Sequence, residues 1–148
     1  PVPKTPFKVF DKDKMLKKYG KDFEKSLSEK ELAPFWIVSH EREFYDKEDP
    51  GQPGKYLNYD LVYPEGFGEA LSGGEREHDH GQILKRMKRL DMDLKKYDSF
   101  IYLAEKGVLP KTAGAGFGVE RLVRYLCGKQ HIRDVSLFPK IPGEAVVL

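Results

Sequence analysis

Apolar residues recur at helical spacing in the first part of the chain, which is otherwise rich in charge. They run from Phe10 to Leu32 with an interruption at Gly20, and this pattern predicts two short surface helices. The segment Phe35–Val38 is instead a continuous apolar run of strand formers directly after Pro34. It predicts a buried strand.

The second half of the pattern alternates between turns, short strands and helices. Prolines and glycines between Glu41 and Lys55 disfavour the regular backbone hydrogen bonding of a strand and predict a mobile loop. The predicted elements after this loop are a strand from Tyr56 to Tyr63, a glycine-rich stretch from Gly66 to Gly74, helices from His80 to Leu90, from Asp93 to Gly107 and from Leu122 to Cys127, and a short strand from Ser136 to Phe138. Because strands and helices do not alternate regularly, the sequence predicts an α+β fold.

Composition narrows the class of protein. The 148 residues, 39% of them hydrophobic, suffice for one sizeable core, so we expect one domain or a piece of one. Lys and Arg total 26 against 24 Asp and Glu, and the net charge of +2 lacks the basic surplus typical of nucleic-acid-binding proteins. No apolar run approaches the roughly 20 residues of a membrane span, so we expect no membrane partner.

The single cysteine and the first residue give two further expectations, one about the cellular compartment and one about the length of the original protein. Cys127 is the only cysteine, which excludes an intramolecular disulfide and fits a reducing cytoplasm. Translation starts at methionine, whereas this chain opens on Pro1. We therefore expect it to be trimmed or cut from something longer.

Three glycines alternate with other residues in the segment GAGFGVER, which runs from Gly114 to Arg121. Their spacing does not fit a dinucleotide-binding fingerprint. On a strand, a period of two puts all three glycines on one face, where a flat ligand or another backbone can lie against the sheet. A glycine-rich strand packed under a helix would explain the glycines equally well. Arg121 at the start of the next helix favours the first interpretation, because free backbone donors and a guanidinium suit a phosphate group.

Carboxylates and a hydroxyl lie in a second glycine-rich segment, GEALSGGER, from Gly68 to Arg76. Glu69 and Ser72, with Asp60 upstream, offer the hard oxygen ligands that Mg²⁺ shares with substrate phosphates. On an extended backbone Arg76 would lie roughly 20 Å beyond Glu69, so we expect a bend or bulge at the glycines. The alternative is a hairpin edge with solvated charges.

Other polar residues have simpler explanations. His78 and His80 lack a third ligand nearby, so a solvated helix start explains them better than zinc. Arg133 and Asp134 suggest a structural ion pair. The remaining basic cluster predicts an exposed helix face and consists of Lys85, Arg86, Lys88 and Arg89.

Together the two glycine-rich segments resemble the catalytic domain of class IIb aminoacyl-tRNA synthetases, in the aspartyl/asparaginyl branch. The segment Gly114–Arg121 is similar to the third signature motif of the class, glycine-x-glycine-x-glycine-x-glutamate-arginine. The segment Gly68–Arg76 is similar to the archaeal-type substrate segment, and IRDVSLFPK from Ile132 to Lys140 resembles the end of the branch's domain. The resemblance covers Phe35–Lys140. It implies the C-terminal part of an antiparallel class II sheet flanked by helices.

The resemblance also implies roles for these residues in a reaction that uses ATP and Mg²⁺. Arg121 would contact the γ-phosphate, while Gly116 and Gly118 would line the adenosine floor. Glu69 would hold the metal and ATP. The further implied residues are Ser72 and Asp60 at the metal, and Arg76, Gly73 and Gly74 at the amino acid.

The family's first two motifs have no counterpart in residues 1–34. We therefore divide the chain into residues 1–34, a charged helical segment that is either an insertion or the edge of a missing N-terminal half, and residues 35–148, the C-terminal part of the catalytic domain. Half of the site would then come from elsewhere. By analogy with the class, we expect a homodimer through a region absent from this chain.

Three functions fit the resemblance. The closer likeness is to archaeal asparaginyl-tRNA synthetase-related proteins, which implies a free-standing asparagine synthetase that joins aspartate and ammonia through a β-aspartyl-adenylate. The alternative enzyme is an asparaginyl-tRNA synthetase that charges tRNA with asparagine. The third candidate is a non-catalytic regulatory paralogue that binds adenylate or a partner.

Overall fold

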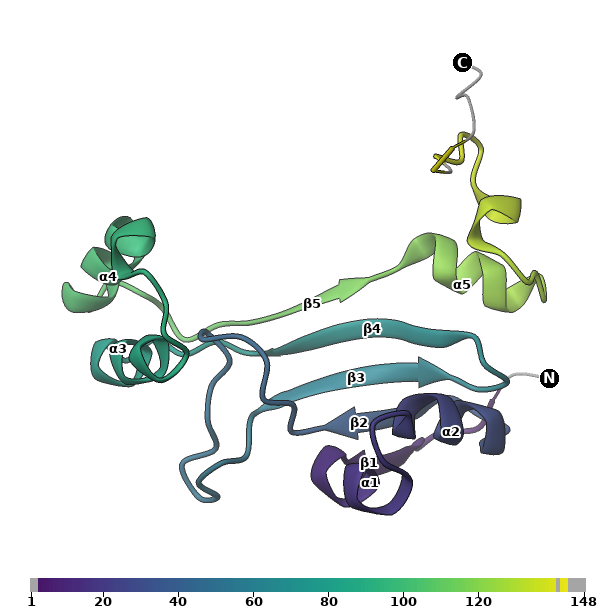
Figure 1. Cartoon of the computed structure of the whole chain (residues 1–148), viewed down its shortest axis with the longest axis horizontal. Coiled ribbons are helices and arrows are strands. Elements are labelled where there is room, and N and C mark those ends of the chain that lie inside the picture. Colours follow the sequence, from purple (N-terminus) through teal and green to yellow (C-terminus); the bar gives the residue numbers. More distant parts are fainter. Residues whose placement is uncertain (1–2, 141, 144–148) are drawn as a thin grey trace. The chain divides into compact units, whose positions relative to one another are not determined.

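The computed structural model, which describes residues 3–140 and 142–143, has the predicted α+β architecture (Figure 1). Its strands are β1 Lys8–Asp11, β2 Phe35–Val38, β3 Asn58–Tyr63, β4 Gly68–Glu75 and β5 Ala113–Phe117. Its helices are α1 Lys12–Tyr19, α2 Phe23–Lys30, α3 His80–Arg89, α4 Asp98–Glu105 and α5 Val119–Leu126, with 3-10 helices η1 Leu94–Tyr97 and η2 Ile132–Val135. The strands form a mostly antiparallel sheet in the order β1-β2-β3-β4-β5. Within the described ranges, no helix combines the length and the apolar character that crossing a membrane requires.

The chain divides into two compact units. The first unit consists of Pro1–Ile37, Asp60–Ser72 and Gly116–Leu148, and the second of Val38–Tyr59 and Gly73–Ala115. The predicted pair of helices before residue 35 is confirmed as α1 and α2 in the first unit. The helix predicted from His80 is confirmed as α3 in the second unit, where the side chain of Asp79 caps its first turn.

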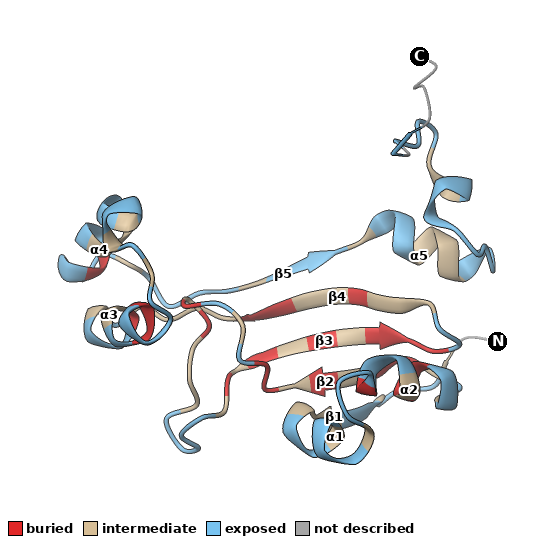
Figure 2. Cartoon of the chain, in the orientation of Figure 1, coloured by how far each residue is buried: buried red, intermediate tan, exposed pale blue. Residues whose placement is uncertain are grey.

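The core of the first unit lies between α2 and the strands beside it. Its buried residues are Phe23, Leu27, Phe35, Ile37 and Val62, against which Phe10, Met15 and Tyr19 pack (Figure 2). Alternate side chains of β2 are fully buried, as the short apolar run predicted. Ser28 then ties α2 to the turn after β3, because its hydroxyl donates to the carbonyl of Tyr63 at 2.7 Å and accepts from the amide of Gly66 at 2.9 Å.

Two tyrosines connect β3 to α5 within the first unit. The rings of Tyr63 and Tyr125 stack with their centroids 4.3 Å apart, and Phe67 meets Tyr125 edge-on. Burial raises the pKa of the Tyr63 phenol, with a smaller contribution from the nearby Tyr125 hydroxyl. Burial also raises the pKa of Tyr125, to which the carboxylate of Glu65 adds. Both hydroxyls therefore favour the neutral form more than free tyrosine does.

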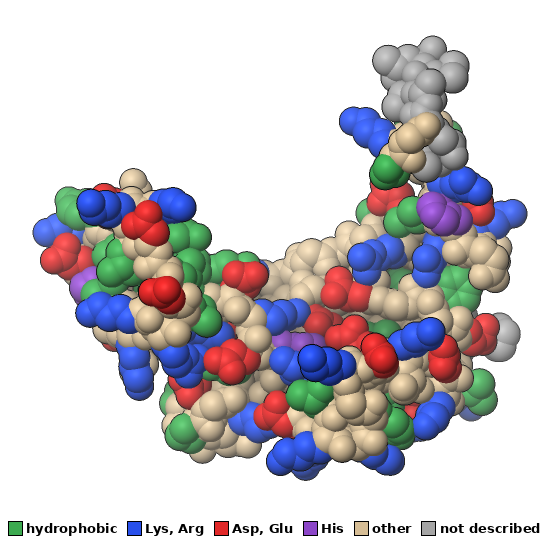
Figure 3. Space-filling view, viewed as in Figure 1, with side chains coloured by type: hydrophobic (Ala, Val, Ile, Leu, Met, Phe, Trp, Pro, Cys, Tyr) green, Lys and Arg blue, Asp and Glu red, His purple; other side chains and the backbone are tan. Residues whose placement is uncertain are grey.

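The core of the second unit is built around Phe44. Its ring lies edge-on to Tyr45, Tyr97 and Phe100, at centroid distances of 5.1 to 5.6 Å. Ile83 completes this core; the other buried residues are Met87 and Ala104. Hydrophobic side chains also reach the surface around α4 (Figure 3). The predicted loop that carries Phe44 is therefore anchored by its aromatic residues, although it contains no regular strand.

The prediction for the last element was wrong. Residues 136–138 form no strand; η2 lies just before them, and Leu137 and Phe138 are 91% and 65% exposed. A short segment becomes a strand only when a neighbouring edge pairs with its backbone, and no sheet in the described part of the chain pairs with residues 136–138. The expected ion pair between Arg133 and Asp134 is present at 3.7 Å.

Candidate functional site

The predicted phosphate-binding arginine meets the predicted metal-binding acid in the first unit. A guanidinium nitrogen of Arg121 on α5 lies 3.6 Å from a carboxylate oxygen of Glu69 on β4, and the same nitrogen donates to the Glu69 carbonyl at 2.7 Å. Both side chains remain nearly half exposed, at 46% and 42%. The pair therefore offers a cation and an oxygen ligand side by side at a surface that solvent and ligands reach.

Gly118 makes room for this pair. It precedes α5, and its amide donates to the carbonyl of Ala70 at 3.1 Å, which joins the start of the helix to β4. A Cβ atom at position 118 would lie 2.9 to 3.2 Å from the side chain of Arg121. The glycine thus lets the arginine fold back toward Glu69.

The predicted strand of alternating glycines is confirmed as β5. A Cβ atom at Gly116 would meet no atom within 4 Å, so the surface above this glycine is open. A Cβ atom at Gly114, in the second unit, would lie 3.4 Å from a guanidinium nitrogen of Arg76. The two glycines therefore have different roles: Gly116 leaves the surface open, and Gly114 makes room for the Arg76 side chain.

Gly73 and Gly74 do not interrupt β4, which runs from Gly68 to Glu75. The two glycines permit close strand packing instead. A Cβ atom at Gly73 would lie 2.6 Å from the Cβ of Ala115, and one at Gly74 would lie 2.6 Å from the Cβ of Asn58. Such distances are too short for any other residue. Packing therefore requires glycine at both positions, whether or not a ligand binds there.

The other predicted metal ligands lie on β4 and β3. Ser72 is half-buried on β4, and Asp60 is buried on β3 with 5% of its surface exposed. The hydroxyl of Ser72 and the carboxylate of Glu69 are both hard oxygen donors of the type that Mg²⁺ prefers. The donor set thus fits Mg²⁺ in chemical type.

Arg76 lies in the second unit, opposite a residue that the sequence analysis missed. The amide of Lys47 donates to the carbonyl of Glu75, and the amide of Glu77 donates to the carbonyl of Tyr45. Asp46 and Arg76 are therefore a directly opposed antiparallel pair of the kind whose side chains approach most closely. A guanidinium nitrogen of Arg76 lies 3.5 Å from a carboxylate oxygen of Asp46.

An apolar cavity of about 500 Å³ lies beside Arg76 in the second unit. Its lining residues are Phe44, Tyr45, Arg76, Glu77, Tyr97, Phe100, Leu109, Pro110 and Thr112. The volume is within the range of small-molecule sites, which combine apolar walls with a few polar groups. Arg76 is thus a charged group that a small ligand can reach.

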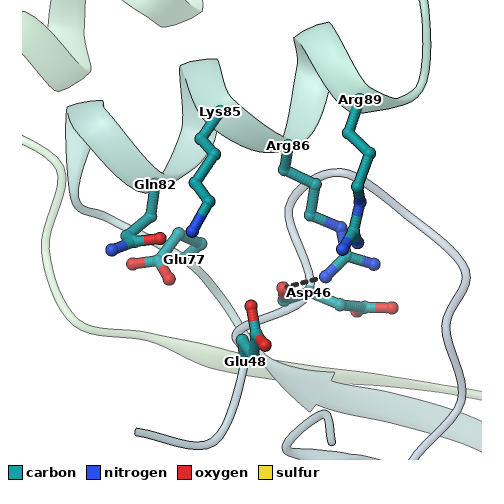
Figure 4. Close-up of a pocket in the computed structure, with 7 residues that line it drawn as sticks. All are labelled: Asp46, Glu48, Glu77, Gln82, Lys85, Arg86 and Arg89. Carbon is teal, nitrogen blue, oxygen red and sulfur yellow. Dashed lines mark hydrogen bonds between the residues drawn. The ribbon is translucent and has the colours of Figure 1, made fainter. Parts of the chain in front are cut away.

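A narrower pocket lies between α3 and the loop that carries Asp46 and Glu48 (Figure 4). The prediction that Arg86 is exposed was wrong, because only 7% of its surface is exposed. Its guanidinium lies 3.9 Å from the centre of the Tyr56 ring and donates to the carbonyl of Asp46 at 3.2 Å. Lys85 beside it on α3 is exposed as predicted. The helix therefore uses Arg86 to hold the loop.

The mixed α+β fold, with its mostly antiparallel five-stranded sheet, is that of a class II synthetase domain. Residues 3–142 match the family described as tRNA synthetases class II (D, K and N), and the chain belongs to this family. The resemblance stated from the motifs is thereby confirmed.

Several relatives are named for asparagine. The chain is similar to the asparagine–tRNA ligase of Pyrococcus furiosus, with 40% identity over 127 residues that make up 84% of this chain and 29% of the relative. It is also similar to the crystal structure of asparaginyl-tRNA synthetase from Pyrococcus horikoshii, with a TM-score of 0.82 and 34% identity over 96% of this chain and 37% of that one. The Entamoeba histolytica asparaginyl-tRNA synthetase in complex with asparaginyl-adenylate matches with a TM-score of 0.84 and 26% identity, over 99% and 38% of the two chains.

The chain thus spans less than a third of the length of the curated relatives that it matches. Their names give no support to the free-standing asparagine synthetase that the motifs suggested first.

Proposed function

We propose that this chain forms the C-terminal part of the site at which an asparaginyl-tRNA synthetase-type ligase joins asparagine to AMP and then to tRNA. The observation that carries the proposal is the pairing of Arg121 with Glu69, which unites the two motifs at an exposed surface. The 40% identity to an asparagine–tRNA ligase supports asparagine as the amino acid and tRNA as its acceptor.

Each predicted site residue of the first unit has a role in this proposal. Arg121 binds the γ-phosphate of ATP, because a half-exposed guanidinium can exchange the Glu69 carbonyl for phosphate oxygens. Glu69 and Ser72 hold Mg²⁺ on the phosphates, with Asp60 as a further acid. Gly116 and Gly118 form the adenosine floor, and the open surface above Gly116 supports this role.

Arg76 binds the side chain of the amino acid from the second unit. The cavity of about 500 Å³ beside its guanidinium supports this role, since an asparagine side chain is small compared with that volume. Gly73 and Gly74 keep β4, which ends directly before Arg76, closely packed against its neighbours, so they act on the amino acid through the backbone.

In the proposed reaction, the α-carboxylate of asparagine attacks the α-phosphorus of ATP and forms the new P–O bond. The bond to the β-phosphate oxygen breaks, and pyrophosphate leaves with its electron pair. Mg²⁺, when bound, would offset the negative charge of the phosphates. Arg121 would hold the leaving group in line, while Arg76 keeps the substrate oriented. A carboxylate nucleophile needs no separate general base.

The test is amino-acid-dependent exchange of pyrophosphate into ATP by the full-length protein, with asparagine and aspartate compared, followed by charging of tRNA with labelled asparagine. Arg121→Ala and Arg76→Ala should each lower exchange strongly. Arg133→Ala removes a half-exposed arginine of the first unit and should leave exchange unchanged. AMP formation from aspartate and ammonia without tRNA would instead establish the asparagine synthetase.

ATP binding without exchange would contradict the proposed function and would leave the non-catalytic paralogue. The cytoplasmic location, the homodimer and the division of the chain at residue 34 stay predictions. Sedimentation of the full-length protein would test the homodimer.

A further inference from the structure

The buried carboxylate of Asp46 is held at a fixed place behind Arg76. Only 2% of its side chain is exposed. One oxygen, Oδ2, accepts from the side-chain amide of Asn58 at 2.9 Å and from the backbone amide of Glu43 at 3.4 Å. The other oxygen, Oδ1, is the one that faces Arg76 at 3.5 Å. The carboxylate can therefore neither rotate freely nor leave the arginine.

Asn58 is itself fixed. Its side-chain oxygen accepts from the amide of His40 at 2.7 Å, and its side-chain nitrogen donates to the His40 carbonyl at 2.7 Å as well as to Asp46. Its three interactions all involve buried groups. Asn58 thus links the Asp46 carboxylate to the backbone of His40 and thereby fixes where the carboxylate lies.

Arg76 is fixed on one face and open on another. Its guanidinium lies 4.8 Å from the centre of the Tyr45 ring, and Gly114 leaves space beside it. The side chain is nevertheless 35% exposed and lines the apolar cavity. A ligand therefore meets a guanidinium that is held in place by Asp46 and whose charge Asp46 partly offsets.

Arg42 stabilises the same buried charge from the other side. Its Nε atom lies 3.8 Å from Oδ2 of Asp46, and its terminal nitrogen donates to the carbonyl of Gly73 at 3.5 Å. Arg42 thus faces Oδ2, whereas Oδ1 stays directed at Arg76.

We propose that Asp46 is the positioning residue of Arg76 and sets the preference of the site for an uncharged amide over a carboxylate. This inference rests on the proposed function, in which Arg76 binds the amino acid's side chain. Asparagine and aspartate differ there only in an amide that replaces a carboxylate. An arginine without a counter-ion would bind the carboxylate more strongly, through two charge-assisted hydrogen bonds. Asp46 offsets part of the positive charge of Arg76 and repels a second negative charge.

The decisive variant is Asp46→Asn, which keeps the shape of the side chain and removes its charge. We expect the ratio of kcat/KM for asparagine to kcat/KM for aspartate, measured by pyrophosphate exchange in the full-length protein, to fall by about tenfold or more. The fall should come mainly from a lower KM for aspartate. Both substrates are assayed on one preparation, so the ratio does not depend on how much of the variant folds.

Asp49→Asn is the matched control. Asp49 lies in the same loop, but its carboxylate bonds locally to Gly51 and Gln52. The ratio should stay at the value of the unmodified protein. Asp46→Glu retains the charge and should keep most of the preference for asparagine.

Each other outcome overturns the inference in a recognisable way. Equal losses for both amino acids in Asp46→Asn would mean that Asp46 is merely structural, and an unchanged ratio would mean that its charge does not reach the ligand. Either result leaves the proposed function intact if the unmodified protein exchanges with asparagine. If the unmodified protein exchanges with neither amino acid, the proposed function fails, and the role of Asp46 in selecting a substrate fails with it.

Discussion

Arg121 and Glu69 are separated by 52 residues, yet a guanidinium nitrogen of the first lies 3.6 Å from a carboxylate oxygen of the second. The start of α5 brings them together, because the amide of Gly118 bonds to the carbonyl of Ala70, directly after Glu69. The two motifs are thus joined by the backbone as well as by their charges. A change at either residue should therefore affect the same function.

Replacing Arg121 with alanine tests this pairing. The variant should lower asparagine-dependent pyrophosphate exchange by about 100-fold to 1,000-fold, since removal of one preorganised donor to a charged transition state has effects of this size. Its circular dichroism should be unchanged, because the side chain is nearly half exposed. Activity close to that of the Arg133→Ala control would contradict the assigned role.

The pairing could be predicted from the sequence only in part. The spacing of the glycines before Arg121 predicted β5, and the position of the arginine predicted a helix start, because both features depend on residues that are close in sequence. The partner of Arg76 could not be predicted in this way. Asp46 lies in a segment rich in turn formers, and its register opposite Arg76 depends on two backbone bonds to residues about 30 positions away.

Burial was the other feature that local patterns missed. Arg86 belongs to a run of basic residues that predicts an exposed face, and Lys85 follows that prediction. The Tyr56 ring and the carbonyl of Asp46 draw Arg86 into the interior; Asp46 belongs to the predicted loop, and Tyr56 directly follows it. The sequence also offers no sign that Gly73 lies against Ala115, because Ala115 is on a strand far along the chain.

Gly73→Ala should destabilise the second unit. The added Cβ would lie 2.6 Å from the Cβ of Ala115 and 2.7 Å from the carbonyl oxygen of Gly114, so the strands must shift apart. We expect a loss of about 1–3 kcal/mol in the free energy of unfolding, measured with urea, as for other overpacked sites. Gly116→Ala on β5 is the control, since its Cβ meets no atom within 4 Å and should change stability by less than about 0.5 kcal/mol.

Arg86→Ala tests whether α3 holds the loop through this side chain. Two of its nitrogens, Nε and Nη2, find no hydrogen-bond partner among the described residues, so the guanidinium stabilises mainly through Tyr56 and its bond to Asp46. We expect a loss of about 1–3 kcal/mol, because packing and a cation–π contact disappear together. Lys85→Ala, one residue earlier on the same helix, should stay within about 0.5 kcal/mol. Equal effects of the two changes would rule out this role for Arg86.

The stacked pair of Tyr63 and Tyr125 predicts how stability changes at alkaline pH. Burial raises the pKa of both phenols above their ordinary value of 10.0. A raised pKa in the folded state means that the unfolded chain loses its phenolic protons first as the pH rises. The stabilisation is therefore fully present below about pH 10 and is lost as the pH rises through the folded-state pKa values.

Tyr125→Phe keeps the ring stack and removes one of the two phenols. Its free energy of unfolding should match that of the unmodified protein near neutral pH and fall less steeply above about pH 10, because one fewer proton is released on unfolding. Tyr102→Phe, which removes a hydroxyl from a side chain that is 56% exposed, should leave the slope unchanged. Urea unfolding across a series of alkaline buffers measures all three slopes. If the Tyr125→Phe curve runs parallel to that of the unmodified protein, the stacked pair does not carry the alkaline sensitivity, and the groups that do must lie elsewhere in the protein.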